Sequence, residues 1–180
     1  LRLRTNFFGK KGHHWFGYIY GDGNFTSQNQ DARISFDRTG IDLTIERPVE
    51  DETWAFFYNF DQYLVTNPND PEQGWGIFGR FGIADESTNF VRKFFSFGLG
   101  GTGLFPGRAS DRFGIGYYYM ELSDEVDLIP VHSDEQGIEI FYSVPLLPST
   151  ELTADVQILD GSFEAADTAV IGGIRLRMKF

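Results

Sequence analysis

The chain has 180 residues, a formal net charge of −11 and no cysteine. Without cysteine there is neither a disulfide scaffold nor a thiolate site, and no apolar run is long enough for a transmembrane helix. The acidic residues cluster in turn-like segments and no basic face is presented, which argues against nucleic acid as a partner. Aromatic residues make up 17% of the chain and there are 21 glycines, a bias typical of membrane β-barrels.

Alternation of apolar and polar residues predicts nine β-strands along the chain. Most have the length of a tilted strand that crosses a bilayer, about 9–11 residues, whereas strands of soluble proteins have roughly 5–6. A further hairpin is predicted for residues 34–36 and 41–45, around Thr39 and Gly40. The nine strands are expected at residues 1–8, 14–21, 53–65, 74–84, 90–100, 112–122, 137–146, 150–159 and 168–180.

Each predicted strand has one apolar parity and one polar or small parity. In the last strand, for example, Val170, Ile174 and Leu176 alternate with Arg175 and Arg177. The strand lengths and the aromatic content favour an antiparallel transmembrane β-barrel, with the apolar parity outside and the polar parity inside. The alternation itself fits a soluble ligand-binding β-barrel with an apolar interior equally well, so this alternative stays open.

The predicted connectors alternate in length, as they do in membrane barrels with short periplasmic turns and long outer loops. Residues 147–149 form a very short turn, whereas residues 21–52 and 122–136 are long. This parity assigns residues 147–149 and the end of the chain to the periplasm. The exception is the segment 101–111, which is rich in glycine, contains a proline and is longer than a periplasmic turn should be.

Several motifs of the chain resemble the OprB-type carbohydrate-selective porins. The most specific is GLGGTGLFPGR at residues 98–108, followed by DRFGIGYYY at residues 111–119. The resemblance also includes GHH at residues 12–14, WGIFGR at residues 75–80 and the closing strand. It therefore extends over most of the chain.

The resemblance implies one porin domain over residues 1–180, located in the bacterial outer membrane. Barrels of this family have about sixteen strands, so the nine strands here would form the C-terminal half of one. The chain also opens directly on a strand pattern, which predicts a fragment that lacks its N-terminal part. The implied activity is passive diffusion of small sugars without a cofactor. The identity of the sugar and the choice between monomer and trimer stay open.

The predicted lumen residues share the polar parity. Arginine and carboxylate side chains exchange hydrogen bonds with sugar hydroxyls, as charged rings set selectivity in other pores. The alternative is that they form cross-strand ion pairs that hold the wall together. The predicted set is Arg80, Arg92, Arg112, Arg175, Arg177, Glu139, Glu151, Asp155 and Tyr118, with Arg2, Arg4, Lys179, Asp61 and Gln157 on the same parity.

Inward aromatic residues have two interpretations as well. Trp15, Phe57, Tyr63, Tyr118 and Phe141 would either stack on sugar rings or fill space against an inner loop. Aromatic residues near the strand ends are interpreted as anchors at the lipid headgroups. These predicted membrane-facing residues are Trp54, Trp75, Tyr117, Tyr119 and Phe180, and the resemblance implies that outer-membrane assembly machinery reads Phe180.

No catalytic or metal-binding constellation is predicted. His13 and His14 are adjacent in a strand, so they point to opposite faces, and His132 stands alone in a loop. Glu151 and Asp155 share a face, but a lumen lined by many charges forms such pairs by chance. A channel is therefore favoured over an enzyme, and a small non-transporting barrel that serves as an adhesin or a structural anchor is the second possibility.

Overall fold

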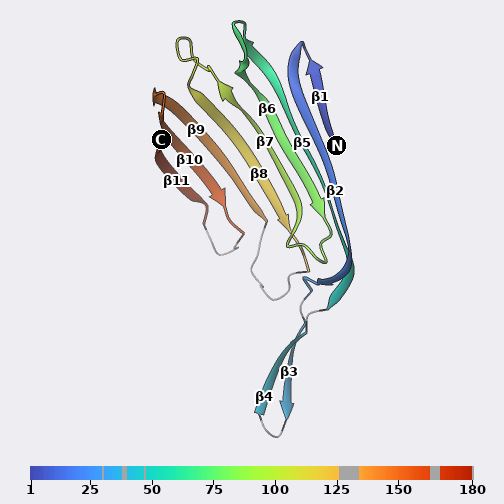
Figure 1. Ribbon diagram of the computed structural model, residues 1–180. Coiled ribbons are helices and arrows are strands. Elements are labelled where there is room, and N and C mark those ends of the chain that lie inside the picture. The colour runs from blue at the N-terminus through green and yellow to red at the C-terminus, as the bar shows by residue number, and fades with distance from the viewer. Residues whose placement is uncertain (30, 38–39, 47, 126–133, 163–166, 180) are drawn as a thin grey trace.

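The computed structural model describes residues 1–29, 31–37, 40–46, 48–125, 134–162 and 167–179. Nine strands form one antiparallel sheet in the order β1-β2-β5-β6-β7-β8-β9-β10-β11, and β3 and β4 form a separate hairpin (Figure 1). Among the described residues there is no helix of the length and apolar character needed to cross a membrane. The strands are β1 (Arg2–Phe7), β2 (Lys10–Thr26), β3 (Asp31–Asp37), β4 (Gly40–Glu46), β5 (Val49–Asn67), β6 (Asp70–Ala84), β7 (Val91–Thr102), β8 (Arg112–Leu122), β9 (Glu135–Leu147), β10 (Thr150–Asp160) and β11 (Ala169–Met178).

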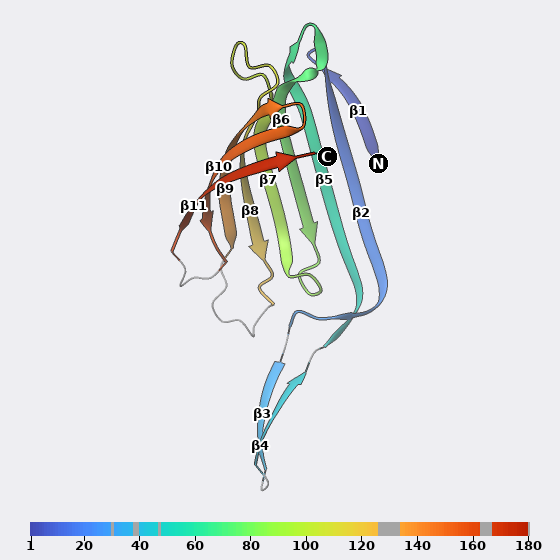
Figure 2. The ribbon, with the colours of Figure 1, turned by 60° about the vertical axis from the view of Figure 1, so that its left-hand side comes forward.

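All nine predicted strands are confirmed, and so is the additional hairpin, although its tip at residues 38–39 lies outside the described residues. The prediction was wrong about the lengths of β2 and β5, which have 17 and 19 residues. Their pairing continues past the end of the apolar alternation, through Phe25 with Glu50 and Thr26 with Val49. The extended ladder leads into the β3–β4 hairpin, which projects away from the sheet (Figure 2).

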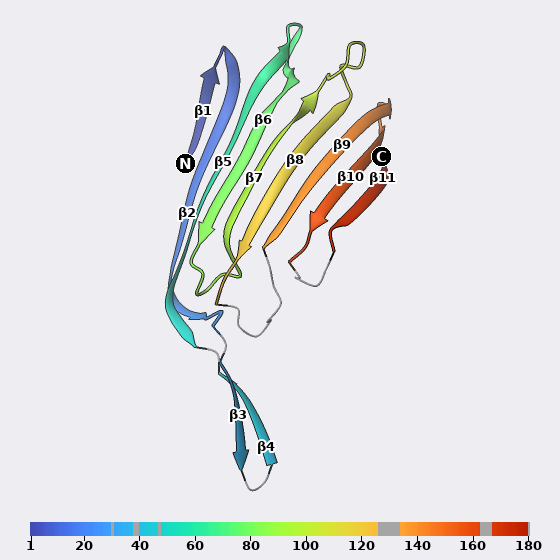
Figure 3. The ribbon, with the colours of Figure 1, turned by 180° about the vertical axis from the view of Figure 1, so that it is seen from behind.

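The sheet is open, with β1 and β11 at opposite edges (Figure 3). Directly paired residues in an antiparallel ladder lie on the same face, so the register shows which parities align across the sheet. Ile140 of β9 pairs with Ile115 of β8 and with Val156 of β10. The same row continues through Leu99 and Ile77. The apolar parities predicted strand by strand therefore form one continuous face, which we call the outer face, and the polar parities form the inner face.

The outer face is not enclosed by the rest of the chain. Ile140 is 51% exposed and Ile174 is 83% exposed, and among the described hydrophobic residues only Phe113 and Leu122 are buried. Three hollows of about 340, 630 and 770 Å³ lie on the inner face, which makes this face the concave one. This arrangement contradicts the alternative of a soluble barrel that encloses its apolar parity.

One end of the sheet carries the short turns. Phe8-Gly9, Pro68-Asn69 and Pro148-Ser149 are two-residue turns at this end, which is the upper end in Figure 1. The predicted connectors at residues 9–13 and 66–73 are thus shorter than expected. Phe8 and Gly9 have φ angles of 55° and 70°, the left-handed pair that a tight hairpin turn requires. We call this end the short-turn end.

The β7–β8 loop lies at the same end but is longer, and its own contacts hold it in shape. Arg108 Nε donates to Asp111 Oδ2 at 2.6 Å, and the Tyr142 hydroxyl donates to the same oxygen at 2.5 Å. The Gly103 amide donates to the Asp111 carbonyl, and Gly103 and Gly107 have φ angles of 73° and 78°. The Pro-Gly-Arg and Asp-Arg-Phe segments of the sequence motif thus build one rigid loop. The hydrogen bonds from Tyr142 and then Arg108 hold the pKa of Asp111 below its usual range, against the opposing effect of burial.

The lipid-facing assignment of the outer face is testable at Ile140. We predict that Ile140→Arg destabilises the protein in lipid by about 2–4 kcal/mol, because it places a charge in the apolar face near mid-strand. The measurement is the free energy of unfolding from vesicles in a denaturant titration. Gln157→Arg is the matched control, since Gln157 pairs with Glu139 on the inner face. Equal stability of Ile140→Arg and the parent would mean that the two faces are inverted.

The loop contacts predict a dependence of stability on pH. Because the folded-state pKa of Asp111 is lowered, its stabilisation is complete above the unfolded value of about 4 and is lost as the pH falls through the folded value. We therefore expect the difference in Tm between the parent and Asp111→Asn to shrink between pH values of about 6 and about 2. A difference that stays constant over this range would show that the carboxylate does not stabilise the fold.

Candidate functional site

The inner face is built from rows of residues that the register aligns across neighbouring strands. One row contains Asn59 of β5, Arg80 of β6, Ser96 of β7 and Tyr118 of β8. The next row towards the short-turn end contains Asp61, Phe78, Gly98, Gly116, Glu139 and Gln157. The structure thus brings five residues of the predicted lumen parity onto two adjacent rows, namely Arg80, Tyr118, Asp61, Glu139 and Gln157.

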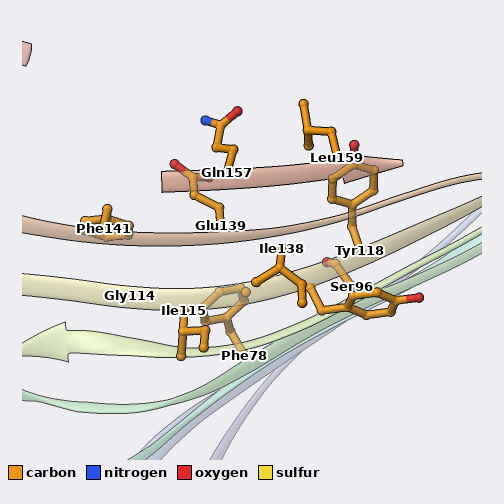
Figure 4. Close-up of a pocket in the computed structure, with 12 residues that line it drawn as sticks. Phe78, Ser96, Gly114, Ile115, Tyr118, Ile138, Glu139, Phe141, Gln157 and Leu159 are labelled. Atoms are coloured by element: carbon orange, nitrogen blue, oxygen red, sulfur yellow. The ribbon is translucent and has the colours of Figure 1, made fainter. Parts of the chain in front are cut away.

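These rows surround a central hollow with a volume of about 340 Å³. Figure 4 shows Glu139 and Gln157 on one side of it, from β9 and β10, and Phe78 and Ser96 on the other. Glu139 and Gln157 are directly paired across the two strands. The Tyr118 hydroxyl donates to Glu135 Oε1 at 2.6 Å, which holds this ring at the edge of the hollow. The hollow therefore combines carboxylate, amide and hydroxyl groups with aromatic surface.

Inner-face aromatic rings lie against glycines of the neighbouring strand. A Cβ atom built on Gly98 would lie 2.4 Å from Phe78 Cζ, and one on Gly114 would lie 2.4 Å from Phe141 Cε1. Gly17 is covered in the same way by Phe57. Glycine is needed at these positions because any side chain would displace the ring. The rings fill space on the wall itself, and Phe78, which was missed from the sequence, is one of them.

A second polar group lies on the inner face near the short-turn end. Arg112 Nη2 donates to Glu151 Oε1 at 2.5 Å, and Arg177 Nη2 donates to Glu151 Oε2 at 3.4 Å. The Glu151 side chain is 18% exposed, whereas both arginines are nearly half exposed. The Glu151 carboxylate thus joins β8, β10 and β11, as the ion-pair interpretation expects. The two guanidinium groups remain partly exposed on the inner face. Nearby, Arg175 pairs in register with Thr153, and the Asp155 carboxylate covers Gly173.

The first strands form a third group that carries positive charge. Arg2 lies over the Trp15 ring at 5.0 Å from its centroid, and His13 Nδ1 is 2.9 Å from Asp61 Oδ2. A hollow of about 770 Å³ lies between them and is also lined by Arg4. The alternation on residues 1–8 already placed these arginines on the polar parity.

Its parity in the sequence predicted Arg92 to lie in the lumen, but the structure places it at the end of the sheet. The ladder between β7 and β8 shifts register between Val91 and Lys93, so Arg92 is the extra residue of a bulge. Its guanidinium is bonded to carboxylates at the end of the sheet opposite the short turns. These partners are Glu86 at 2.7 Å, Asp124 at 3.0 Å and Glu121. The structure therefore places Arg92 at the rim of the sheet and not in one of the paired rows of the inner face.

Of the predicted anchor residues, Tyr119, Trp54 and Trp75 lie towards the ends of the outer face, whereas Tyr117 is the middle residue of β8. Towards the end opposite the short turns, the Tyr117 hydroxyl donates to Gln136 Oε1 at 2.9 Å and the Tyr119 hydroxyl donates to Asp134 Oδ2 at 2.5 Å. Trp54 is also at this end. Trp75 is at the short-turn end, with its ring edge-on to Phe113 at 6.5 Å. Phe180 lies outside the described residues.

The two adjacent histidines lie on opposite faces, as predicted. His13 contacts Asp61 on the inner face, whereas His14 Nδ1 is 2.7 Å from the Tyr58 hydroxyl on the outer face. In the part of the chain that the structure describes, no group of three or more potential ligands is placed to hold a metal ion. His132 lies outside this part.

Comparison with known proteins adds two findings. The sequence model of the family described as "Carbohydrate-selective porin, OprB family" matches residues 4–180. The high-pH structure of OprB from Pseudomonas putida superposes with a TM-score of 0.81 at 18% sequence identity. The superposition covers 99% of this chain but 47% of the Pseudomonas putida chain, so the chain spans about half the length of that porin. No curated protein sequence matches the chain.

Proposed function

Because the chain belongs to the OprB family of carbohydrate-selective porins, we propose that its sheet is about half of the wall of a sugar channel. Membership of this family places the chain in the bacterial outer membrane. In the proposal, residues 1–180 are one porin domain, and the other strands of the barrel pair with β1 and β11. The observation that carries it is the register, which assembles one apolar face and one polar face from nine strands.

The proposed mechanism is diffusion down a concentration gradient through a hydrated lumen. A neutral sugar exchanges its hydration for hydrogen bonds to fixed groups on the wall, and it leaves because each contact is weak. Arg80 and Glu139 offer a donor and an acceptor on adjacent rows of the inner face, and Phe78 offers apolar surface beside them. Arginine suits this role because its planar guanidinium donates several hydrogen bonds in fixed geometry.

The second polar group would set the charge of the lumen near the short-turn end. Glu151 accepts from both Arg112 and Arg177, so one negative charge faces two positive charges. Arg175 of β11 and Lys179, which directly follows β11, add positive charge. This end of the wall would therefore favour anions over cations. The ion pairs and the transport role are compatible, because each arginine has more donors than Glu151 uses.

Two partners follow from the proposal. The lipid bilayer covers the outer face, and outer-membrane assembly machinery recognises the closing strand through Phe180. The proposed recognition by the assembly machinery is supported by the aromatic residue that follows the alternating pattern of this strand. The family indicates a channel.

The proposal predicts that inner-face arginines change transport more than stability. In the full-length porin, Arg80→Ala and Arg177→Ala should each weaken the block of ion current by added sugar. One hydrogen bond to a charged group contributes about 1.5–3 kcal/mol, so loss of a direct contact corresponds to about tenfold or more in sugar affinity. Glu151→Gln should shift the ion selectivity towards anions. The measurement is planar-bilayer conductance and reversal potential, with and without sugar.

Lys93→Ala is the matched control. Lys93 forms an ion pair with Glu121 at the rim, so this substitution removes one positive charge, as the arginine variants do, but outside the proposed lumen. If the two arginine variants fold normally and conduct like Lys93→Ala, these arginines only support the wall. If the parent porin itself conducts no ions, the protein is the non-transporting barrel that the sequence left as the second possibility.

A further inference from the structure

The β7–β8 loop is the feature of the short-turn end that channel function does not explain. The other described connections at this end are turns of two residues, whereas this loop extends from Gly103 to Asp111. A porin needs only to reverse the chain here, and two residues are enough. The extra residues are nevertheless held rigidly by Arg108, Asp111 and Tyr142. A loop that is long and also fixed in shape presents a defined surface.

That surface is apolar and exposed. Leu104 is 42% exposed and Phe105 is 53% exposed, and they are followed by Pro106. Together with Val65 and Trp75 these residues line a groove of about 370 Å³ between the loop and the β5–β6 turn. An adjacent leucine and phenylalanine in a loop that faces water would be unfavourable, so the position of the groove relative to the bilayer matters.

The groove is continuous with the outer face. Val65, Trp75, Phe113 and Tyr142 occupy one row of the outer face, and in β6 and β8 this is the last apolar row at the short-turn end. The Phe105 ring lies 5.9 Å from the Tyr142 ring, so the loop adds an aromatic residue to this row. Phe113 is only 7% exposed although it belongs to the outer face. The apolar face that contacts lipid thus extends beyond the ends of β7 and β8 onto the loop.

The charge of the loop complements a phosphate. Between Gly103 and Asp111 the charged residues are Arg108 and Asp111. The Asp111 side chain is 6% exposed, whereas that of Arg108 is 50% exposed, so the charge that the loop presents outward is positive. Arginine at the level of the headgroups binds phosphate oxygens, and aromatic residues prefer the same level.

We propose that the β7–β8 loop is a phospholipid-binding loop of the periplasmic leaflet. The acyl chain lies along Leu104, Phe105 and Trp75, and the phosphate faces Arg108. The inference rests on the proposed function, because it requires that the outer face contacts a bilayer and that the short turns are periplasmic. It gives the Gly-Gly to Pro-Gly-Arg motif a role in anchoring the barrel at one level of the membrane.

The test places a fluorophore on the loop in the full-length porin, reconstituted into phosphatidylethanolamine–phosphatidylglycerol vesicles. This chain has no cysteine, so Phe105→Cys allows site-specific labelling of it with an environment-sensitive dye. Asn69→Cys is the control for an exposed two-residue turn at the same end, and Ile140→Cys is the control for the outer face. Leu104→Cys replaces Phe105→Cys if the latter does not fold. Brominated phospholipids quench a dye in lipid, and iodide quenches a dye in water.

We expect the dye at position 105 to lose its emission to brominated lipid as the dye at position 140 does, while the dye at position 69 loses its emission to iodide. If position 105 behaves like position 69 while position 140 is quenched by brominated lipid, the loop projects into water or binds a periplasmic macromolecule, and the lipid inference is wrong. If position 140 is also quenched only by iodide, the outer face does not contact lipid and the proposed function fails with it.

Discussion

The structure depends on one constraint, which is that every strand must satisfy its backbone hydrogen bonds with a neighbour. In a bilayer no water is available to do so, and only helices and laterally paired strands meet the requirement. Once strands pair directly, the period of two residues sends alternate side chains to opposite faces. Each register shift of one residue would move a whole parity to the wrong face. The aligned row from Ile77 through Leu99, Ile115 and Ile140 to Val156 shows that the five strands from β6 to β10 place their apolar residues on the same face.

The side-chain chemistry follows from this constraint. Polar groups are tolerated on the inner face, where Glu151 can serve two arginines, and at the rim, where Arg92 can serve three carboxylates. Large rings on the inner wall need room, and glycines on the neighbouring strand give it, as under Phe78 and Phe141. On the outer face, tyrosine hydroxyls donate hydrogen bonds to polar residues where the apolar surface gives way to the loops. The bond from Tyr119 to Asp134 is an example.

The sequence alone predicted the elements that depend on local alternation. Side chains alternate between the two faces of a strand with a period of two residues. This period alone predicted all nine strands, the extra hairpin and the face of almost every apolar residue. It failed where the backbone departs from that period. The bulge at Arg92 moved a predicted lumen residue to the rim, and a second register shift at Leu64 places Val65 opposite Trp75.

Contacts between distant residues were also beyond prediction. The bond from Tyr142 to Asp111 joins residues 31 positions apart, so the sequence identified the segment 101–111 as unusually long but did not give the reason. Phe78 was overlooked because its role depends on a glycine of the next strand. Parity predicted which residues share the inner face, but parity does not say which of them meet in one hollow.

The central claim is that alternate residues of each strand face lipid and lumen, and β10 tests it most directly. Thr153, Asp155 and Gln157 are on the inner face of this strand, and Ala154, Val156 and Ile158 are on the outer face. Single cysteines at these six positions in the full-length porin, in vesicles, would be reacted with a charged, membrane-impermeant thiol reagent. We expect fast modification at 153, 155 and 157 and little at 154, 156 and 158. Equal rates at all six positions, or the opposite alternation, would contradict the two-faced wall and the channel built from it.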